Sequence, residues 1–204
     1  MHHSTRTYYE AYAEDYFRKT HSKPLWALWD KLNERLTPNS VILDLGCGSG
    51  RDVRHFTSHG FRAIGLDLAF NFLTLARQVS QEPFLQADFL ALPFRDNSFD
   101  AVWAIGSLLH APRQFLPTVL SEIHRVLKAG GVFLASVKKG HGEAMEMGRL
   151  FVFYQPDEWK TLLAESSHKE VEIAEMNELR KTDSGEEQEI TWIVSIATPT
   201  AKVL

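Results

Sequence analysis

Three alternating glycines directly follow a short apolar segment, in the sequence Val-Ile-Leu-Asp-Leu-Gly-Cys-Gly-Ser-Gly of residues 41–50. Because glycine has no Cβ atom, such a bend can lie against a ligand, and a helix starting there points its free N–H groups at the same place. The glycines Gly46, Gly48 and Gly50 form a G-x-G-x-G pattern, whereas dinucleotide sites typically show G-x-G-x-x-G. We therefore expect a nucleoside ligand other than NAD at this bend.

Acidic residues stand at or near the ends of three strand-like segments. Asp44 belongs to the first segment, Asp67 ends the second, and Asp88 follows the third. Asp67 lies 17 residues after Gly50. An acid at that distance sits at the tip of the neighbouring strand, where its oxygens can accept hydrogen bonds from both hydroxyls of a ribose. Together, the bend and the three acids form a more specific pattern than any of them alone.

The segment that follows the fourth expected strand, residues 103–112, contains a histidine. In doubly wound sheets, ligands bind beyond the carboxyl ends of the strands, so the reacting group is expected near this segment. His110 is the candidate general base, because imidazole titrates near neutrality and can take a proton from a hydroxyl or an amine. The alternative is that His110 only orders its loop.

The pattern of apolar residues predicts alternating strands and helices between two N-terminal helices and a C-terminal pair of strands. Such alternation is typical of a parallel sheet with helices on both faces. The expected strands are 41–45, 62–66, 84–87, 99–105, 131–137, 171–179 and 189–197, and the expected helices are 5–20, 25–36, 50–58, 69–80, 113–128 and 156–165.

In the order and spacing of its motifs, the chain resembles the class I S-adenosylmethionine-dependent methyltransferases over roughly residues 5–197. The blocks that carry the resemblance are Leu-Asp-Leu-Gly-Cys-Gly-Ser-Gly at 43–50, Gly-Leu-Asp at 65–67, Ala-Asp-Phe at 87–89, Phe-Asp-Ala-Val-Trp at 99–103 and Glu-Ile-His-Arg-Val-Leu-Lys-Ala-Gly-Gly at 122–131. The resemblance implies a doubly wound, Rossmann-like α/β fold with a seven-stranded, mostly parallel sheet and a closing antiparallel hairpin.

The resemblance also implies S-adenosylmethionine as the cofactor and S-adenosylhomocysteine as the product. Gly46 and Gly48 would pack under the methionine part, and Asp67 would bind the ribose. Asp88 would meet the adenine amine, with Leu68 and Phe89 flanking the ring. The remaining expected cofactor contacts are Tyr16, Asp44, Cys47, Arg51, Ala104 and Ile105. Arg51 could instead face solvent, and Cys47 is expected to be a small side chain that fits the bend.

The acceptor side is expected to involve the N-terminal helix and the segment after the fifth strand. Tyr8, Tyr9 and Tyr12 could line the acceptor pocket beneath a helical lid, or could simply pack. Arg149 and Tyr154 belong to a segment that resembles the variable acceptor-side insertion of small-molecule methyltransferases. A basic cluster of Lys138, Lys139, His141 and Arg149 is either a solvated loop or the rim of a pocket for an anionic substrate.

The expected reaction is transfer of a methyl group to an oxygen, nitrogen or sulfur atom of a small molecule by in-line displacement. The alternatives are methylation of a peptide, protein or tRNA, an NAD(P)-dependent oxidoreductase, and a non-catalytic partner subunit. The Asn/Asp-Pro-Pro-Tyr signature of amino-methylating enzymes is absent from residues 103–112, which disfavours nucleobase-amine or glutamine methylation. The acceptor, the need for a general base and the oligomeric state do not follow from the sequence.

Composition limits the remaining choices. The 204 residues are 44% hydrophobic, which suits one domain: a helical lid at 1–38, a cofactor-binding core at 39–137, and an acceptor-side insertion with closing strands at 138–204. The net charge of −4 argues against nucleic acid as partner. A single cysteine and the lack of long apolar runs favour a cytoplasmic protein without membrane contact. No metal is expected, since His55 and His59 lack a third ligand.

Overall fold

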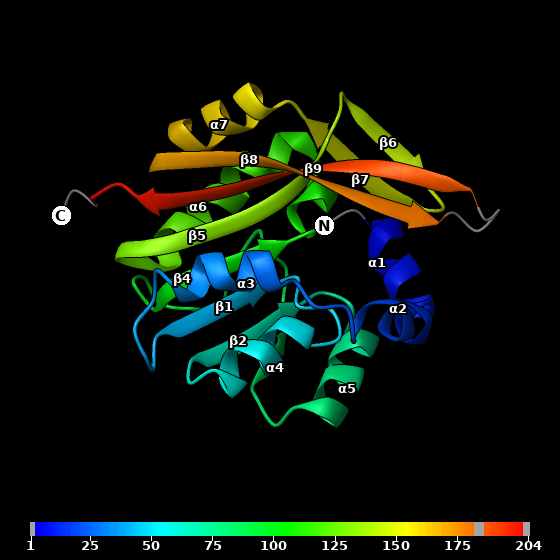
Figure 1. Ribbon diagram of the computed structural model, residues 1–204, viewed down its shortest axis with the longest axis horizontal. Coiled ribbons are helices and arrows are strands. Elements are labelled where there is room, and N and C mark those ends of the chain that lie inside the picture. The colour runs from blue at the N-terminus through cyan, green and yellow to red at the C-terminus, as the bar shows by residue number, and fades with distance from the viewer. Residues whose placement is uncertain (1–2, 182–185, 202–204) are drawn as a thin grey trace.

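A single mixed sheet organises the chain, of which the computed structural model describes residues 3–181 and 186–201 (Figure 1). Five parallel strands form its first part, in the order β3-β2-β1-β4-β5, and two antiparallel strands, β9 and β8, extend it beyond β5. The predicted fold is confirmed. The strand bounds are β1 Val41–Leu45, β2 Arg62–Asp67, β3 Phe84–Gln86, β4 Phe99–Ile105, β5 Leu127–Lys139, β8 His168–Lys181 and β9 Glu187–Pro199.

Helices cover both faces of the sheet because successive residues of each buried strand point to opposite sides. On β1, Ile42 packs with helices α3, α4 and α5, whereas Leu43 packs with α6 and α7 on the other face. Trp103 and Val102 of β4 repeat this division. The helix bounds are α3 Trp26–Asn33, α4 Arg51–Ser58, α5 Phe70–Val79, α6 Leu116–Val126 and α7 Pro156–Glu165, with short 3-10 turns η1 Leu108–His110 and η2 Arg113–Phe115.

The order of the strands creates a switch point at β1. After β1, the chain passes through α4 to β2, which pairs with one edge of β1. Strand β4 pairs with the other edge of β1. Ligand sites of open α/β sheets lie at the carboxyl edge of such a point. The glycine bend leaves β1 at this edge.

The N-terminal segment forms two helices, α1 His3–Ala11 and α2 Ala13–Thr20, where the sequence pattern predicted one. The chain leaves helical geometry at Tyr12, with φ −112° and ψ 19°. Both helices pack on α5, and α1 also contacts β7, so they lie at one end of the sheet in Figure 1. No helix in the described part of the chain is both long and apolar enough to cross a bilayer.

A second hairpin, β6 Glu143–Glu146 and β7 Arg149–Tyr154, was not predicted from the sequence. Met147 and Gly148 turn it with φ values of 50° and 83°, the left-handed pair that a tight two-residue hairpin needs. β7 pairs in parallel with the end of β5 at Lys138, whose other edge is paired with β9. β4 pairs with β5 only as far as Ser136. Beyond that residue, β7 pairs with the same edge of β5.

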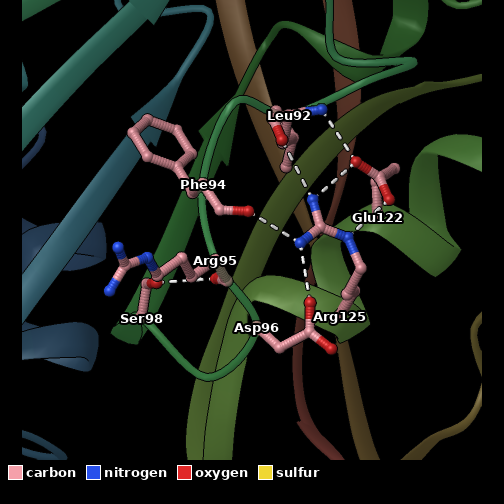
Figure 2. A network of polar contacts seen from close by, with 7 residues as sticks. All are labelled: Leu92, Phe94, Arg95, Asp96, Ser98, Glu122 and Arg125. Carbon is pink, nitrogen blue, oxygen red and sulfur yellow. Dashed lines mark hydrogen bonds and ion pairs between the residues drawn. The ribbon is translucent and has the colours of Figure 1, made fainter.

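The connection after β3 has no regular structure, yet side chains of α6 hold it in place (Figure 2). The guanidinium of Arg125 donates to the carbonyl oxygens of Leu92 and Phe94 and to the Asp96 carboxylate, at 2.7–2.9 Å. Glu122 accepts from the Leu92 N–H at 2.7 Å and also pairs with Arg125. This network fixes the segment that begins with Asp88.

Candidate active site

The glycine bend is fixed by backbone contacts with β2. The N–H groups of Gly46 and Cys47 both donate to the Leu66 carbonyl, at 2.7 and 3.0 Å. Gly46 has φ +81°, and a Cβ atom there would lie 2.3 Å from Cβ of Ser107, so only glycine fits. A Cβ at Gly48 would meet nothing within 4 Å, which leaves open space directly above the bend.

Asp67, the last residue of β2, lies beside the glycine bend. Its two carboxylate oxygens accept the N–H groups of Gly48 at 3.0 Å and Ala69 at 2.9 Å. Burial raises the pKa of Asp67 to about 6. Each oxygen retains a second lone pair, so the carboxylate can still accept hydrogen bonds from a diol.

Asp44 and Asp52 form an acidic layer beneath the bend. Asp52 accepts from the indole N–H groups of Trp29 and Trp103, each at 3.0 Å, and pairs with Arg51 at 2.8 Å. Burial, and next the charge of Asp52, raise the pKa of Asp44 well above its ordinary range. Oδ2 of Asp44 is buried without a hydrogen-bond partner in the described structure. An orphaned buried oxygen of this kind suits a ligand that brings its own donors.

Two cavities meet beyond the ends of β1 and β4. The first, here called the glycine cavity, has about 130 Å³ and is lined by the bend, Asp67, Phe72 and Ser107, among others. The second, the hairpin cavity, has about 390 Å³ and is lined by residues of β5, β7, β8 and β9 and of the N-terminal helices. They share the lining residues Tyr9, Tyr16, Thr20, Arg51, Ile105, Gly106 and His110.

His110 lies at this border, but its ring is fully engaged. Its Nδ1 lies 2.6 Å from the Leu150 carbonyl oxygen, which can only accept, so Nδ1 carries the proton. Nε2 then accepts from the Tyr9 hydroxyl at 2.8 Å. Burial lowers the pKa of His110 to about 4, and the ring is neutral at pH 7. The prediction of a general base assumed that His110 has a pKa near neutrality, whereas its pKa in this structure is about 4.

Helix α1 is anchored over the border at three points. Thr5 Oγ1 accepts the Leu150 N–H at 2.9 Å, and Tyr9 bonds to His110. The carboxylate of Glu10 accepts the N–H groups of Phe70 and Asn71 at 2.8 and 2.9 Å, capping α5, whose own N-cap residue offers no side chain for this purpose. Helix α1 thus places Tyr9 in the lining of both cavities, while its role as a lid stays a prediction.

The structure brings most of the predicted cofactor residues together and leaves others apart. Tyr16, Gly46, Cys47, Gly48, Arg51, Asp67 and Ile105 line the glycine cavity. Burial raises the pKa of the Cys47 thiol, which fits a small filler of the bend. Five others lie outside the lining: Asp44 and Ala104 in the buried sheet, Phe89 in the core, and Leu68 and Asp88 half-buried beyond the strand ends.

The predicted acceptor residues divide in the same way. Tyr9 and Arg149 line the hairpin cavity. Tyr8 stacks under the Arg149 guanidinium, 4.4 Å from its Cζ atom, and Tyr12 is 48% exposed outside both linings. Tyr154 is fully buried between Trp159 and Arg113 and does not reach the cavity, because alternate residues of β7 face opposite ways.

Several lining residues were missed by the sequence analysis. Gly106 and Ser107 follow β4 directly, and their place at the strand end was the available signal. Ser136, Met176, Glu178, Arg180 and Trp192 come from β5 and the C-terminal hairpin. Nothing in their local sequence distinguishes them, since only the pairing of β9 with β5 carries them to the site.

Comparisons with known proteins agree with this architecture. Residues 43–135 match the family model described as a methyltransferase domain. Sterol 24-C-methyltransferase erg6 of Schizosaccharomyces pombe is 39% identical over 106 residues, which are 48% of this chain but 28% of that protein. The chain thus spans a minor part of the curated relatives that it matches.

Solved structures share the fold over nearly the whole chain. One is the 1,6-didemethyltoxoflavin-N1-methyltransferase of Burkholderia thailandensis, solved with bound 1,6-didemethyltoxoflavin and S-adenosylhomocysteine. It gives a TM-score of 0.73 at 22% identity, and the match covers 97% of this chain and 88% of that one. A S-adenosylmethionine-dependent methyltransferase of Methanosarcina mazei gives 0.69 at 18% identity, with 84% and 98% covered. At these identities the likeness shows the fold alone, whereas the family match disfavours the oxidoreductase alternative.

Proposed function

We propose that this chain, which belongs to the class I S-adenosylmethionine-dependent methyltransferase family, transfers a methyl group to an oxygen, nitrogen or sulfur atom of a small-molecule acceptor. The observation that carries this proposal is the shared border of the two cavities at Ile105 and Gly106. A cofactor held in the glycine cavity can present its reactive end there to an acceptor in the hairpin cavity.

The residues of the glycine cavity fit S-adenosylmethionine. The carboxylate of Asp67 would bind the ribose hydroxyls, and the open space above Gly48 would take the amino-acid part. The unpartnered oxygen of Asp44 lies below the bend, where bridging donors could satisfy it. When bound, S-adenosylmethionine supplies a methyl group already activated by its sulfonium charge.

The task left to the chain is positioning. Residues at the border must hold the nucleophile about 3–3.5 Å from the methyl carbon, in line with the bond that breaks, and must exclude water. Tyr9 can do this with its hydroxyl, which donates a hydrogen bond to Nε2 of His110 and is also hydrogen-bonded to Arg149, so that its orientation at the border is fixed. His110 would then act through Tyr9 as a positioning residue, and an acceptor proton would reach it only by way of the Tyr9 oxygen.

The size and cover of the hairpin cavity favour a small acceptor. Its volume is about 390 Å³, and α1 lies over it with three anchoring contacts. A peptide or tRNA substrate would need an open groove leading to the border. We therefore rank macromolecular acceptors second, and we retain a cytoplasmic location as part of the proposal.

The test combines cofactor binding with methyl transfer to an undefined acceptor. Calorimetry should show one site for S-adenosylhomocysteine, and labelled S-adenosylmethionine should transfer its label to a low-mass component of a metabolite extract. Asp67→Ala should weaken cofactor affinity at least a few-fold, since it removes a charged hydrogen-bond acceptor of the ribose. Label appearing only in protein or RNA fractions would favour the second-ranked acceptors, and absence of cofactor binding would reject the proposal.

A further inference from the structure

Two half-buried cations of the hairpin cavity have no carboxylate partner in the described part of the chain, whereas Lys23, a third cation of the lining without an ion pair there, is exposed. Lys138 of β5 and Arg149 of β7 line the wall of the cavity, and both are half-buried. Over residues 3–181 and 186–201, neither forms an ion pair with a carboxylate. The other arginines of the cavity differ, since Arg51 pairs with Asp52 and Arg180 with Glu178.

Aromatic rings hold these two cations in place. Nζ of Lys138 lies 4.0 Å from the centre of the Phe151 ring, and Cζ of Arg149 lies 5.0 Å from the same centre. Tyr8 stacks on the far side of Arg149. Cation–π contacts orient a charge but do not neutralise it. Burial lowers the pKa of Lys138, which shows that its charge is held at a cost that an anion would offset.

Glu178 and Glu146 both raise the pKa of Lys138 by their charge, and Glu146 lies opposite Arg149 in the β6–β7 pairing, but neither forms an ion pair with Lys138 or Arg149 in the described residues. Glu178 lines the cavity, but it accepts the indole N–H of Trp192 at 3.0 Å and pairs with Arg180. Glu146 stands on the exposed strand β6 and is not part of the lining. Nε of Arg149 is buried without a hydrogen-bond partner in the described structure. The pair thus offers donors and positive charge toward the same space.

The basic cluster noted in the sequence is therefore divided by the fold. Lys139 points to the exposed side and binds Glu175 at 2.8 Å, and His141 is exposed beside Gln155. Only Lys138 and Arg149 of that cluster reach the cavity. Alternation along β5 separates Lys138 from Lys139, which supplies a matched control on the same strand.

We propose, on the premise of the methyl transfer proposed above, that Lys138 and Arg149 form a subsite for an anionic group of the acceptor. The group would be a carboxylate or a phosphate, because a guanidinium and an ammonium together match paired anionic oxygens. The rest of the acceptor would be apolar and would lie against Phe151, Met176 and Trp192, which line the same cavity. The acceptor class is thus an apolar small molecule with one anionic substituent.

The test uses two probes of the same shape that differ in charge, benzoate and benzamide. Binding to the whole chain, with and without S-adenosylhomocysteine, is followed through the indole N–H resonance of Trp192. Benzoate should bind about tenfold more tightly than benzamide, the difference expected for a charge-assisted contact. Lys138→Met and Arg149→Met should each remove that preference, whereas Lys139→Met should retain it. Lys138→Arg should retain part of it and guards against a misfolded methionine variant.

Equal affinity for the two probes, no resonance shift with either, or the same loss in Lys139→Met would overturn the anionic subsite. These outcomes are separable from the fate of the methyltransferase proposal. Failure to bind S-adenosylhomocysteine would reject that proposal while leaving the preference for benzoate measurable in the free protein. Cofactor binding without a preference for benzoate would reject the subsite alone.

Discussion

The two cavities are built in different ways. The glycine cavity depends on one bend and one strand end, and its key contacts are backbone N–H groups, such as those of Gly48 and Ala69 on Asp67. The hairpin cavity is assembled from side chains of the N-terminal helices and of strands β5, β7, β8 and β9. A backbone-built site leaves a short, ordered motif in the sequence, whereas a side-chain-built site leaves scattered residues with no common pattern.

The largest effect is expected from a substitution in the glycine bend, which tests whether the backbone of the bend shapes the glycine cavity. Gly46→Ala should destabilise the fold by about 2–4 kcal/mol and weaken cofactor binding about a hundredfold, because the new Cβ meets Ser107 and the left-handed φ is strained. Thermal unfolding and calorimetry measure both quantities.

Gly60→Ala is the matched control, since Gly60 has φ +84° but open space around its Cβ position and lies outside both linings. It should cost about 1 kcal/mol through strain and leave cofactor affinity unchanged. If Gly46→Ala behaves like this control, the close approach to Ser107 does not shape the cavity.

The next effect follows from the pKa of Asp67, which burial raises to about 6. Ribose hydroxyls donate to the carboxylate, so the ionised form binds and protonation opposes binding. Affinity for S-adenosylhomocysteine should be level above pH 7 and about tenfold lower at pH 5, in proportion to the ionised fraction. The raised pKa also means that the contribution of Asp67 to stability is present below its unfolded pKa and is lost as pH rises through 6.

Calorimetry of wild type and Asp67→Asn between pH 5 and 8 measures this dependence. The variant should bind more weakly at pH 7 and should show no such pH dependence. A variant that keeps the wild-type profile would assign the titration to another group.

A smaller effect is expected from a substitution of Tyr9, at the border of the two cavities. Tyr9→Phe leaves Nε2 of His110 buried without a donor and removes the hydroxyl that faces both cavities. The single-turnover rate of methyl transfer should fall about tenfold, the cost of one buried hydrogen bond, with cofactor affinity changed less than about twofold. Tyr12→Phe, at the break between α1 and α2, should change neither. Equal losses in the two variants would indicate a general role of the N-terminal segment rather than of the Tyr9 hydroxyl.

The contrast between the cavities also explains what the sequence could predict. The bend, the alternation of strands and helices and the position of Asp67 follow from local rules about glycine, apolar periodicity and strand ends, and all are present in the structure. The hairpin β6–β7 and the contributions of Met176 and Trp192 depend on pairings between distant segments. Tyr154 was predicted on the acceptor side because it belongs to β7. Its side chain is instead buried in the core, on the face of β7 opposite to the hairpin cavity.

The smallest effect concerns Tyr154 itself. Its ring is buried, its hydroxyl has no hydrogen-bond partner in the described structure, and it does not line the hairpin cavity. Tyr154→Phe should change methyl transfer less than about twofold and should leave stability equal or slightly higher, since an unsatisfied polar group is removed. A large loss of activity would move Tyr154 back to the acceptor side, as the sequence predicted.

In the proposed complex, one ligand spans from Asp67 to the border at Gly106. A crystal structure of the chain with S-adenosylhomocysteine tests it most directly. We expect the ribose hydroxyls on the Asp67 carboxylate and the sulfur beside Gly106, open to the hairpin cavity. A ribose bound away from Asp67, or a sulfur closed off from the hairpin cavity, would contradict this arrangement.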